Sequence, residues 1–408
     1  MDGAEALSSQ AEHLRPTALE IAAGAMFGDE PEAPVAESDP SLAPRAALEE
    51  LVRAALEPGP CLVTLSGGRD SSAVLAVAAH VARREGLPLP VPITVRFHAA
   101  PGTGEAEWQD LVVRHLALEE WVVLDVDDEL DLVGPVSARL LARHGILYPA
   151  HACLFALMVE HARGGSLLTG VGGDSIFGSW RYWTLLDSLA ARRRPDRGDV
   201  EAAAHLLAPG PVRRAVARAR APSRPWLSPE AERLVEAQIG ASAARAPRSW
   251  SAHLASRLRA RAFVATLATL RLLGEAEAAV ASDPLSDSSF VAALARAGGK
   301  TGLGSRTAIM QKLFGDLLPE SLVVRADKAR FPFAYFRAPS RAFAASWSGQ
   351  GLDPALVDAE RLRATWLELL PNGYTALAIQ QAWLASGGGD AGEQLPRLVQ
   401  EVEATGPP

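Results

Sequence analysis

The chain has 408 residues, 48% of them hydrophobic, and a formal net charge of −8. This length and apolar content suffice for two domains with a substantial core, and the mild acidity gives no electrostatic basis for binding nucleic acid. No apolar segment is long enough to span a bilayer and no basic-then-apolar leader is present, so we expect a cytoplasmic protein without a membrane partner.

The N-terminal part leads into a first strand and a polar loop. Residues 1–48 are rich in Ala, Pro, Glu and Asp and predict an extension with a short helix and a loop. A helix over 48–56 precedes the apolar run 61–65, which predicts a buried strand. Residues 66–72 read SGGRDSS and precede the amphipathic run 73–84, so the chain passes from strand to helix through a loop without bulky apolar side chains.

The SGGRDSS loop has the composition of an anion-binding turn. Backbone N–H groups at a helix N-terminus favour an anion, and Gly67 and Gly68 let the backbone approach phosphate closely. Asp70 places a carboxylate where a cation bridging phosphates would bind. Hydroxyl donors come from Ser66, Ser71 and Ser72. The simpler interpretation is a glycine turn with a Ser or Asp helix cap. It explains each part of the loop separately, but the complete seven-residue string favours phosphate binding.

Further strands are predicted at 91–97, 121–126 and 166–169, and they alternate with helical patterns. Such alternation indicates a parallel sheet with right-handed crossovers. We therefore predict an α/β, Rossmann-like fold in residues 49–185, with a twisted parallel sheet of about five strands and helices on both faces. Residues 186–408 are rich in Ala, Arg and Leu at helical spacing and predict a largely helical C-terminal subdomain.

A second glycine-rich loop follows the predicted strand at 166–169. It reads GVGGDSIFG over 170–178, contains Asp174, and would form a polar crevice with backbone from Gly170, Gly172 and Gly173. Because ligands in parallel sheets bind at the carboxyl ends of the strands, we expect Asp70 and Asp174 to lie together. Two carboxylates there would hold one Mg²⁺ against a triphosphate, with waters completing the octahedron.

In their order, these motifs resemble the synthetase half of class B, glutamine-type asparagine synthetases and their relatives, β-lactam synthetase and the lasso-peptide cyclases. These enzymes belong to the N-type ATP pyrophosphatases. SGGRDSS resembles the family's SGGxDSS, and the resemblance runs from about residue 46 to residue 331. The other matches are 168–178 to a strand followed by SGxGxDExxGG, 284–287 to PFLD, 306–307 to GRTK and 318–331 to LPxxLLxRxKxxF.

The resemblance implies a reaction and a set of site residues. A carboxylate would be adenylated by ATP with release of pyrophosphate, and ammonia or an amine would attack the acyl-adenylate. Asp70 and Asp174 would bind Mg²⁺, and Lys328 would reach the α-phosphate and the leaving pyrophosphate, which makes these three the implied catalytic residues. The residues implied to line the nucleotide pocket are Leu65, Ser66, Val95, Thr169 and Gly170.

Several features depart from the family pattern. Only about 48 residues precede the synthetase region, without a glutaminase domain, so ammonia would be free or supplied by a separate glutaminase. Val171 stands where the asparagine enzymes carry Glu, Ser175 replaces the Glu of the DE pair, and one extra residue separates Arg325 from Lys328. These changes leave the ATP motifs intact and leave aspartate-to-asparagine conversion open.

Two alternatives follow from these departures. The first is a condensing enzyme or macrocyclase of natural-product biosynthesis, in which an amine attacks a carboxylate on a peptide or small molecule and a precursor peptide is the partner. The second is a non-catalytic nucleotide-binding homologue. Among the histidines near the fourth strand, His151 beside Tyr148 is the one expected at a pocket, although such histidines more often belong to a helix surface or a core.

Overall fold

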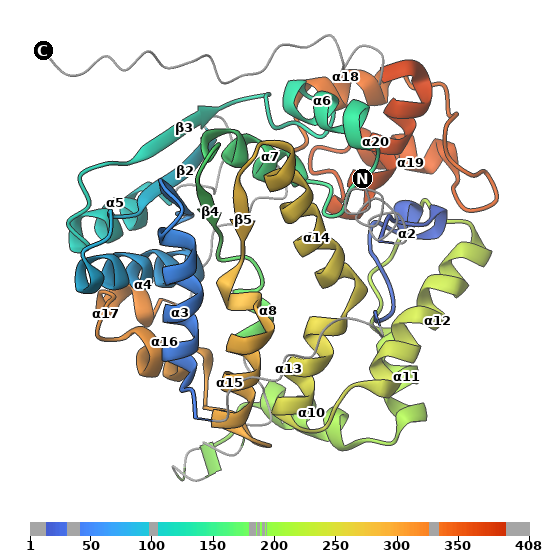
Figure 1. The fold of residues 1–408 in the computed structure, drawn as a ribbon. Coiled ribbons are helices and arrows are strands. Elements are labelled where there is room, and N and C mark those ends of the chain that lie inside the picture. The colour runs from blue at the N-terminus through green and yellow to red at the C-terminus, as the bar shows by residue number, and fades with distance from the viewer. Residues whose placement is uncertain are drawn as a thin grey trace, which may run out of the picture.

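The computed structural model describes residues 14–30, 41–97, 105–178, 185, 188–189, 192, 194–325 and 334–388. In these ranges a five-stranded parallel sheet carries helices on both faces, and a further group of helices lies to one side (Figure 1). The predicted α/β fold with a helical C-terminal region is thereby confirmed. None of the helices in the described ranges has the length and apolar character that crossing a membrane requires.

The sheet has the strand order β3-β2-β1-β4-β5, and all neighbouring strands pair in parallel. Four strands lie within one residue of their predicted bounds, because each is an apolar or β-branched run between turn residues. The strands are β1 (Cys61–Thr64), β2 (Val91–Phe97), β3 (Val122–Val126), β4 (Ser166–Leu168) and β5 (Val280–Ser282).

Strand β5 comes from the stretch for which only helices were predicted. It has three residues, Val280–Ser282, which is too short for a periodic pattern to show. Its pairing with β4 aligns Ser166 with Val280 and Leu168 with Ser282. Residues beyond 185 therefore also contribute to the α/β core, and they bring the segment after Ser282 to the carboxyl edge of the sheet.

Helices cover both faces of the sheet. Side chains of Cys61 and Val63 pack in one apolar cluster with α3 and α4, whereas Leu62 packs in another with α7 and α14. Successive side chains of a strand point to opposite faces, so a strand that is buried on both faces is a continuous apolar run. The helices around the sheet are α3 (Pro44–Leu56), α4 (Arg69–Glu85), α5 (Ala106–His115), α6 (Pro135–His144), α7 (Ala152–His161), α8 (Gly173–Ile176) and α14 (Arg261–Ala276).

The remaining described elements are helical. They are α2 (Ala18–Ala23), α10 (Arg197–Leu207), α11 (Gly210–Ala219), α12 (Pro229–Arg245), α13 (Trp250–Arg259), η1 (Pro284–Ser286), α15 (Ser288–Gly298), α16 (Arg306–Phe314), α17 (Glu320–Val323), α18 (Ala338–Ser346), α19 (Ala359–Leu367), η2 (Gly373–Thr375), α20 (Ala376–Trp383) and the π-helical turn η3 (Leu384–Gly388). Helix α2, the short helix expected in the N-terminal extension, packs against α12 and α20 (Figure 1). Trp226 Nε1 donates to the carbonyl of Ala22 at 2.8 Å, which ties this helix to the C-terminal half.

The order in which strands are added to the sheet reverses at β1. The chain runs from β1 through β2 to β3 at one edge, and β4 then returns to the other side of β1. In open parallel sheets, ligands bind outside the carboxyl ends of the strands at such a switch point. Here the switch point lies between β1 and β4, and the two glycine-rich loops leave the sheet on either side of it.

Candidate active site

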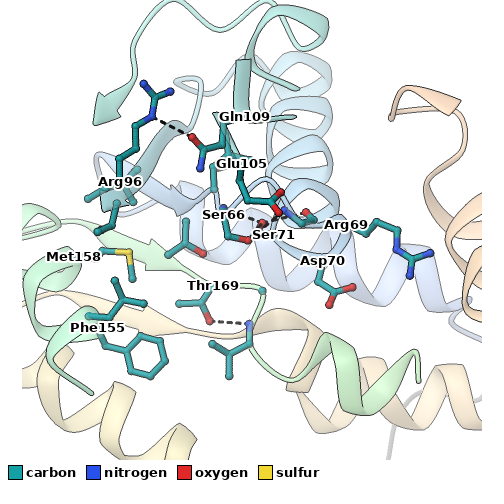
Figure 2. Close-up of a pocket in the computed structure, with 18 of the residues that line it drawn as sticks. Ser66, Arg69, Asp70, Ser71, Arg96, Glu105, Gln109, Phe155, Met158 and Thr169 are labelled. Atoms are coloured by element: carbon teal, nitrogen blue, oxygen red, sulfur yellow. Dashed lines mark hydrogen bonds between the residues drawn. The ribbon is translucent and has the colours of Figure 1, made fainter. Parts of the chain in front are cut away.

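A cavity of about 940 Å³ lies at the carboxyl ends of β1, β2 and β4, with Ser66, Asp70, Ser71 and Thr169 around it in Figure 2. Most of the predicted site residues line it, namely Leu65, Ser66, Gly68, Asp70, Ser71, Val95, Thr169, Gly170, Gly172 and Asp174. Three other predicted residues, Gly67, Ser72 and Gly173, are not among the described residues that line the cavity. Lys328 lies outside the described residues.

The first loop is held together by its own hydroxyls. The Ser66 N–H donates to Ser71 Oγ at 3.2 Å, and the Gly68 N–H donates to Ser66 Oγ at 3.3 Å. Helix α4 begins at Arg69, earlier than predicted, so the end of the motif forms its first turn. Ser72, expected to donate a hydroxyl, is fully buried and has no side-chain partner among the described residues, because its place on the helix faces the core and not the cavity.

The two glycine-rich loops are in direct contact. A Cβ atom on Gly170 would lie 2.6 Å from the backbone nitrogen of Ser71, and a Cβ atom on Gly173 would lie 2.4 Å from Cγ of Asp70. Both distances are far below van der Waals contact, so only glycine fits at these positions without movement of the loops. The absence of side chains there lets the loop after β4 pack against the first turn of α4.

Asp70 and Asp174 meet at one guanidinium group. Arg306 Nη2 lies 2.7 and 2.6 Å from the two carboxylate oxygens of Asp70, and its Nη1 donates to Asp174 Oδ1. The Asp70 and Arg306 side chains are 12% and 20% exposed, whereas Asp174 is 52% exposed at the mouth of the cavity. Burial lowers the pKa of Arg306, but the two carboxylates outweigh burial and raise it overall. The predicted pairing of the two loops thus brings both carboxylates to one point.

A second arginine, Arg69, stands beside this pair in the cavity lining. Its Nη1 donates to Thr307 Oγ1 at 3.3 Å and to the carbonyl of Val323 at 3.4 Å. Burial and the neighbouring guanidinium of Arg306 lower the pKa of Arg69. Two guanidinium groups therefore lie beside the two carboxylates at this end of the cavity, and guanidinium groups bind carboxylate and phosphate oxygens through charge-assisted hydrogen bonds.

A buried ion pair fixes the glycine turn to the C-terminal half. Arg325 Nη2 donates to Glu105 Oε1 at 2.8 Å, and its Nη1 donates to the Gly67 carbonyl at 3.1 Å. The Arg325 and Glu105 side chains are only 6% and 5% exposed, and the guanidinium lies 4.5 Å from the centre of the Trp108 ring. Removing one partner of such a pair leaves an uncompensated buried charge, so both are needed to keep the turn in place.

The opposite end of the cavity is apolar and aromatic. The His151 ring stacks on the Tyr335 ring, and the two ring centroids are 5.4 Å apart. The sequence had suggested Tyr148 as the neighbour of His151. The His151 side chain is exposed where it lines the cavity, and desolvation by the protein atoms around it lowers its pKa to about 4. Burial raises the pKa of Tyr335. The apolar side chains that share this lining are Phe97, Leu154, Phe155 and Met158.

A buried acid supports the second loop from behind. Ser286 Oγ lies 2.9 Å from the carbonyl oxygen of Val171 and within hydrogen-bond distance of Asp283 Oδ2. A hydroxyl has one hydrogen, so if Ser286 donates it to Val171, the contact with Asp283 requires a proton on the acid. Burial raises the pKa of Asp283 well above its usual value, which agrees with a neutral acid there. The hydrogen bonds from Asp283 to Ser286 and from Ser286 to Val171 hold the second loop in place.

A comparison with protein-family models matches residues 44–385 to the family described as asparagine synthase. The chain belongs to the asparagine synthase family. The match covers both glycine-rich loops, Arg306 and the apolar end of the cavity. Membership of this family indicates an ATP-dependent ligase and therefore a nucleotide requirement. A comparison with curated proteins gave no match.

The carboxylate pair of this asparagine synthase family member fits a divalent cation that is shared with phosphate. One guanidinium contacts both acids, so Asp70 and Asp174 face the same point of the cavity. Mg²⁺ is usually held by one or two carboxylates together with waters and substrate phosphates. In the described ranges no group of three or more His, Cys, Asp or Glu side chains is arranged as a metal site.

Several residues of the site were not predicted from the sequence as functional. Arg306 belonged to a matched motif, and a cation in the first turn of a helix, where the helix dipole disfavours it, was a usable signal. Arg69 occupies the variable position of SGGxDSS. Glu105 and Tyr335 carry no sequence signal, because each becomes part of the site only through a partner distant in the chain.

Proposed function

We propose that the protein adenylates a carboxylate with Mg·ATP and transfers the acyl group to an amine, releasing AMP and pyrophosphate. One observation carries this proposal. Asp70 and Asp174, from two glycine-rich loops, converge at the switch point of a parallel sheet beside the N-terminus of α4. Family membership supports the same class of reaction.

The first step takes place at the charged end of the cavity. A carboxylate oxygen attacks the α-phosphorus, and the bond from this phosphorus to the bridging oxygen of pyrophosphate breaks. Mg²⁺, held by Asp70 and Asp174, would neutralise phosphate charge. Arg69 and Arg306 stand where negative charge grows on the leaving pyrophosphate, so the protein contributes positioning and electrostatic stabilisation. The role of Lys328 on the α-phosphate stays a prediction.

In the second step an amine attacks the acyl carbon, the bond to AMP breaks, and the amine loses a proton. His151 is the described imidazole that lines the cavity. With a pKa of about 4 it is neutral near pH 7, so it can accept a hydrogen bond from an uncharged amine. The same low pKa makes it a weak proton acceptor, so we assign it the orientation of the amine and not the storage of its proton.

The apolar end of the cavity supports a substrate larger and less polar than aspartate. Phe155, Met158 and Tyr335 supply apolar surface that the short side chain of aspartate would leave uncovered. Arg96 and Asp125 of the same lining offer charged partners to polar groups of a larger substrate. A volume of about 940 Å³ lies near the upper end of the range of about 300–1,000 Å³ for ligand sites, which supports a nucleotide and a second substrate together. Together with Val171 in the position of the family Glu, this favours a condensing enzyme or macrocyclase acting on a peptide or natural product.

A pyrophosphate-release assay over matched pairs of acids and amines tests the proposal. We expect turnover with a carboxylate that carries an apolar or aromatic group and a primary amine, and less with aspartate and ammonium. The Asp174→Asn variant is the control for release that does not use this site. Turnover with aspartate and ammonium alone would instead establish asparagine formation, for which a separate glutaminase is the expected partner. ATP binding without release from any pair would favour a non-catalytic homologue.

A further inference from the structure

The Arg306 guanidinium occupies the place between the two carboxylates where a divalent cation would bind. Its Nη2 uses both oxygens of Asp70, at 2.6 and 2.7 Å, and its Nη1 uses one oxygen of Asp174. Mg²⁺ needs the same oxygens at about 2.0–2.1 Å in near-octahedral geometry. The guanidinium and the metal ion therefore compete for the same ligands.

The position of Arg306 is not explained by the stability of its own helix. Arg306 is the first residue of α16, where the positive end of the helix dipole disfavours a cation. Its Nε atom is buried and has no partner among the described residues. Ser305 caps the helix through the Ala308 N–H at 3.2 Å, so α16 does not need Arg306 for its start. The contacts that hold this side chain in place are those with the two acids.

A triphosphate offers the displaced guanidinium another partner. Arginine binds phosphate oxygens through paired hydrogen bonds as readily as it binds carboxylates. The metal ion and the phosphates arrive together in Mg·ATP, so the exchange leaves no charge unpaired: the metal takes the carboxylates and Arg306 takes phosphate. Without nucleotide, a metal ion alone would have to displace Arg306 into water.

We infer that Arg306 closes the carboxylate pair to divalent metal until a nucleotide binds, and then moves to the phosphates. This inference rests on the proposed function, since it takes Mg·ATP as the ligand. It makes Arg306 a positioning residue that couples metal binding to nucleotide binding. Thermodynamic coupling is reciprocal, so the nucleotide must increase metal affinity by the same factor as the metal increases nucleotide affinity.

Manganese binding without nucleotide tests this inference. The electron paramagnetic resonance signal of free Mn²⁺ is recorded during titration of the wild-type protein and of Arg306→Met, which keeps the length of the side chain and loses its charge. We expect the variant to bind Mn²⁺ about tenfold more tightly or better, within the usual range of coupling between two sites. Equal binding by both proteins would overturn the inference.

Arg69→Met is the matched control for charge. Arg69 interacts electrostatically with both acids. Among the described residues its hydrogen bonds go to Thr307 and to the Val323 carbonyl, and not to a carboxylate oxygen. We expect its removal to tighten Mn²⁺ binding only slightly. If Arg69→Met tightens binding as much as Arg306→Met does, the effect is one of net charge and the inference fails. In a double variant, Asp70→Asn should abolish the gain from Arg306→Met, since it removes the ligand.

Thermal unfolding gives a second readout and separates this inference from the proposed function. For the wild type we expect no stabilisation by Mg²⁺ alone and clear stabilisation by Mg²⁺ with a non-hydrolysable ATP analogue, whereas Arg306→Met should respond to Mg²⁺ alone. Arg306→Lys, which keeps the charge but cannot bridge both acids, should respond in between and serves if the methionine variant does not fold. Wild-type stabilisation by Mg²⁺ alone would refute the inference without touching ligase activity, whereas absence of pyrophosphate release would refute only the proposed function.

Discussion

The two ends of the cavity are built from different parts of the chain. The charged end consists of two glycine-rich loops at the sheet edge, with Arg306 reaching in from α16. The apolar end consists of Phe97 from β2, His151 just before α7, side chains of α7 and Tyr335. The charged end can serve the activation of any carboxylate, whereas the apolar end contacts whatever is specific to the substrate. Changes at the charged end should therefore lower the rate for every substrate, and changes at the apolar end should alter the choice among them.

The largest effect is expected from Asp70→Asn. The substitution removes a charge that both Mg²⁺ and Arg306 need, so pyrophosphate release should fall about 10²–10³-fold with every pair of acid and amine. Steady-state release assays measure this. The control is Asp316→Asn, which alters a 68% exposed acid paired with Arg45 at 3.5 Å and should leave the rate unchanged. A rate that fell for one substrate and not for another would contradict the division between the two ends.

A smaller effect at the same end is expected from Gly173→Ala. The new methyl group would lie 2.4 Å from Cγ of Asp70, so the carboxylate must move. A displacement of this kind should weaken binding of a non-hydrolysable ATP analogue with Mg²⁺ by about tenfold, measured by calorimetry. Gly373→Ala is the matched control, because nothing lies within 4 Å of a Cβ atom there. Unchanged affinity in Gly173→Ala would mean that Asp70 does not contribute to nucleotide binding.

At the apolar end, His151→Phe should slow the amine step only. It removes a hydrogen-bond acceptor worth about 1 kcal/mol, so amide formation should fall about fivefold while exchange of pyrophosphate into ATP stays unchanged. Because desolvation lowers the pKa of His151 to about 4, the imidazole stays neutral above about pH 5, and His151→Gln should leave the pH profile between 5.5 and 7.5 unaltered. If the wild-type pH–rate profile has an inflection near pH 6.5 that His151→Gln lacks, His151 instead titrates in the working pH range.

The smallest effect concerns the acid behind the second loop. Burial raises the pKa of Asp283, so the folded protein binds this proton more tightly than the unfolded chain does. The free energy of unfolding of the wild type should therefore decline as pH rises above the pKa of an ordinary aspartate, because the unfolded chain loses this proton first. Asp283→Asn cannot ionise at this position and should not show the decline. Urea unfolding at pH 4.5, 6 and 7.5 should show an advantage of the variant that widens with pH. A constant difference would mean that Asp283 is already charged.

The charged end was largely predictable from the sequence. Strand β1 is an apolar run buried on both faces, and β2 is buried over 92–94. The glycines and aspartates that follow β1 and β4 are local in the chain, so composition and spacing predicted both loops. The parallel topology then predicted that Asp70 and Asp174 would meet. Ser72 was placed wrongly as a donor because the start of α4 turns it toward the core.

The apolar end and the cation between the acids were not predictable in this way. Arg306 lies 236 positions from Asp70 and 132 from Asp174, and the stacking of Tyr335 on His151 likewise joins residues far apart in the chain. No local pattern encodes such contacts, because they depend on how helices pack. The three residues of β5 were missed for a related reason: their strand conformation comes from pairing with β4 and not from their own periodicity.

The amino-acid sequence by itself determined the parallel sheet, its two glycine-rich turns and the family of enzymes to which the chain belongs, since these depend on residues adjacent in the chain. Only the tertiary structure decided that a guanidinium from α16 occupies the space between the two carboxylates, and that α7 and Tyr335 form the other end of the cavity. Both arrangements arise from helix packing over the sheet, where the position of a side chain is set by neighbours that the linear order of residues does not reveal.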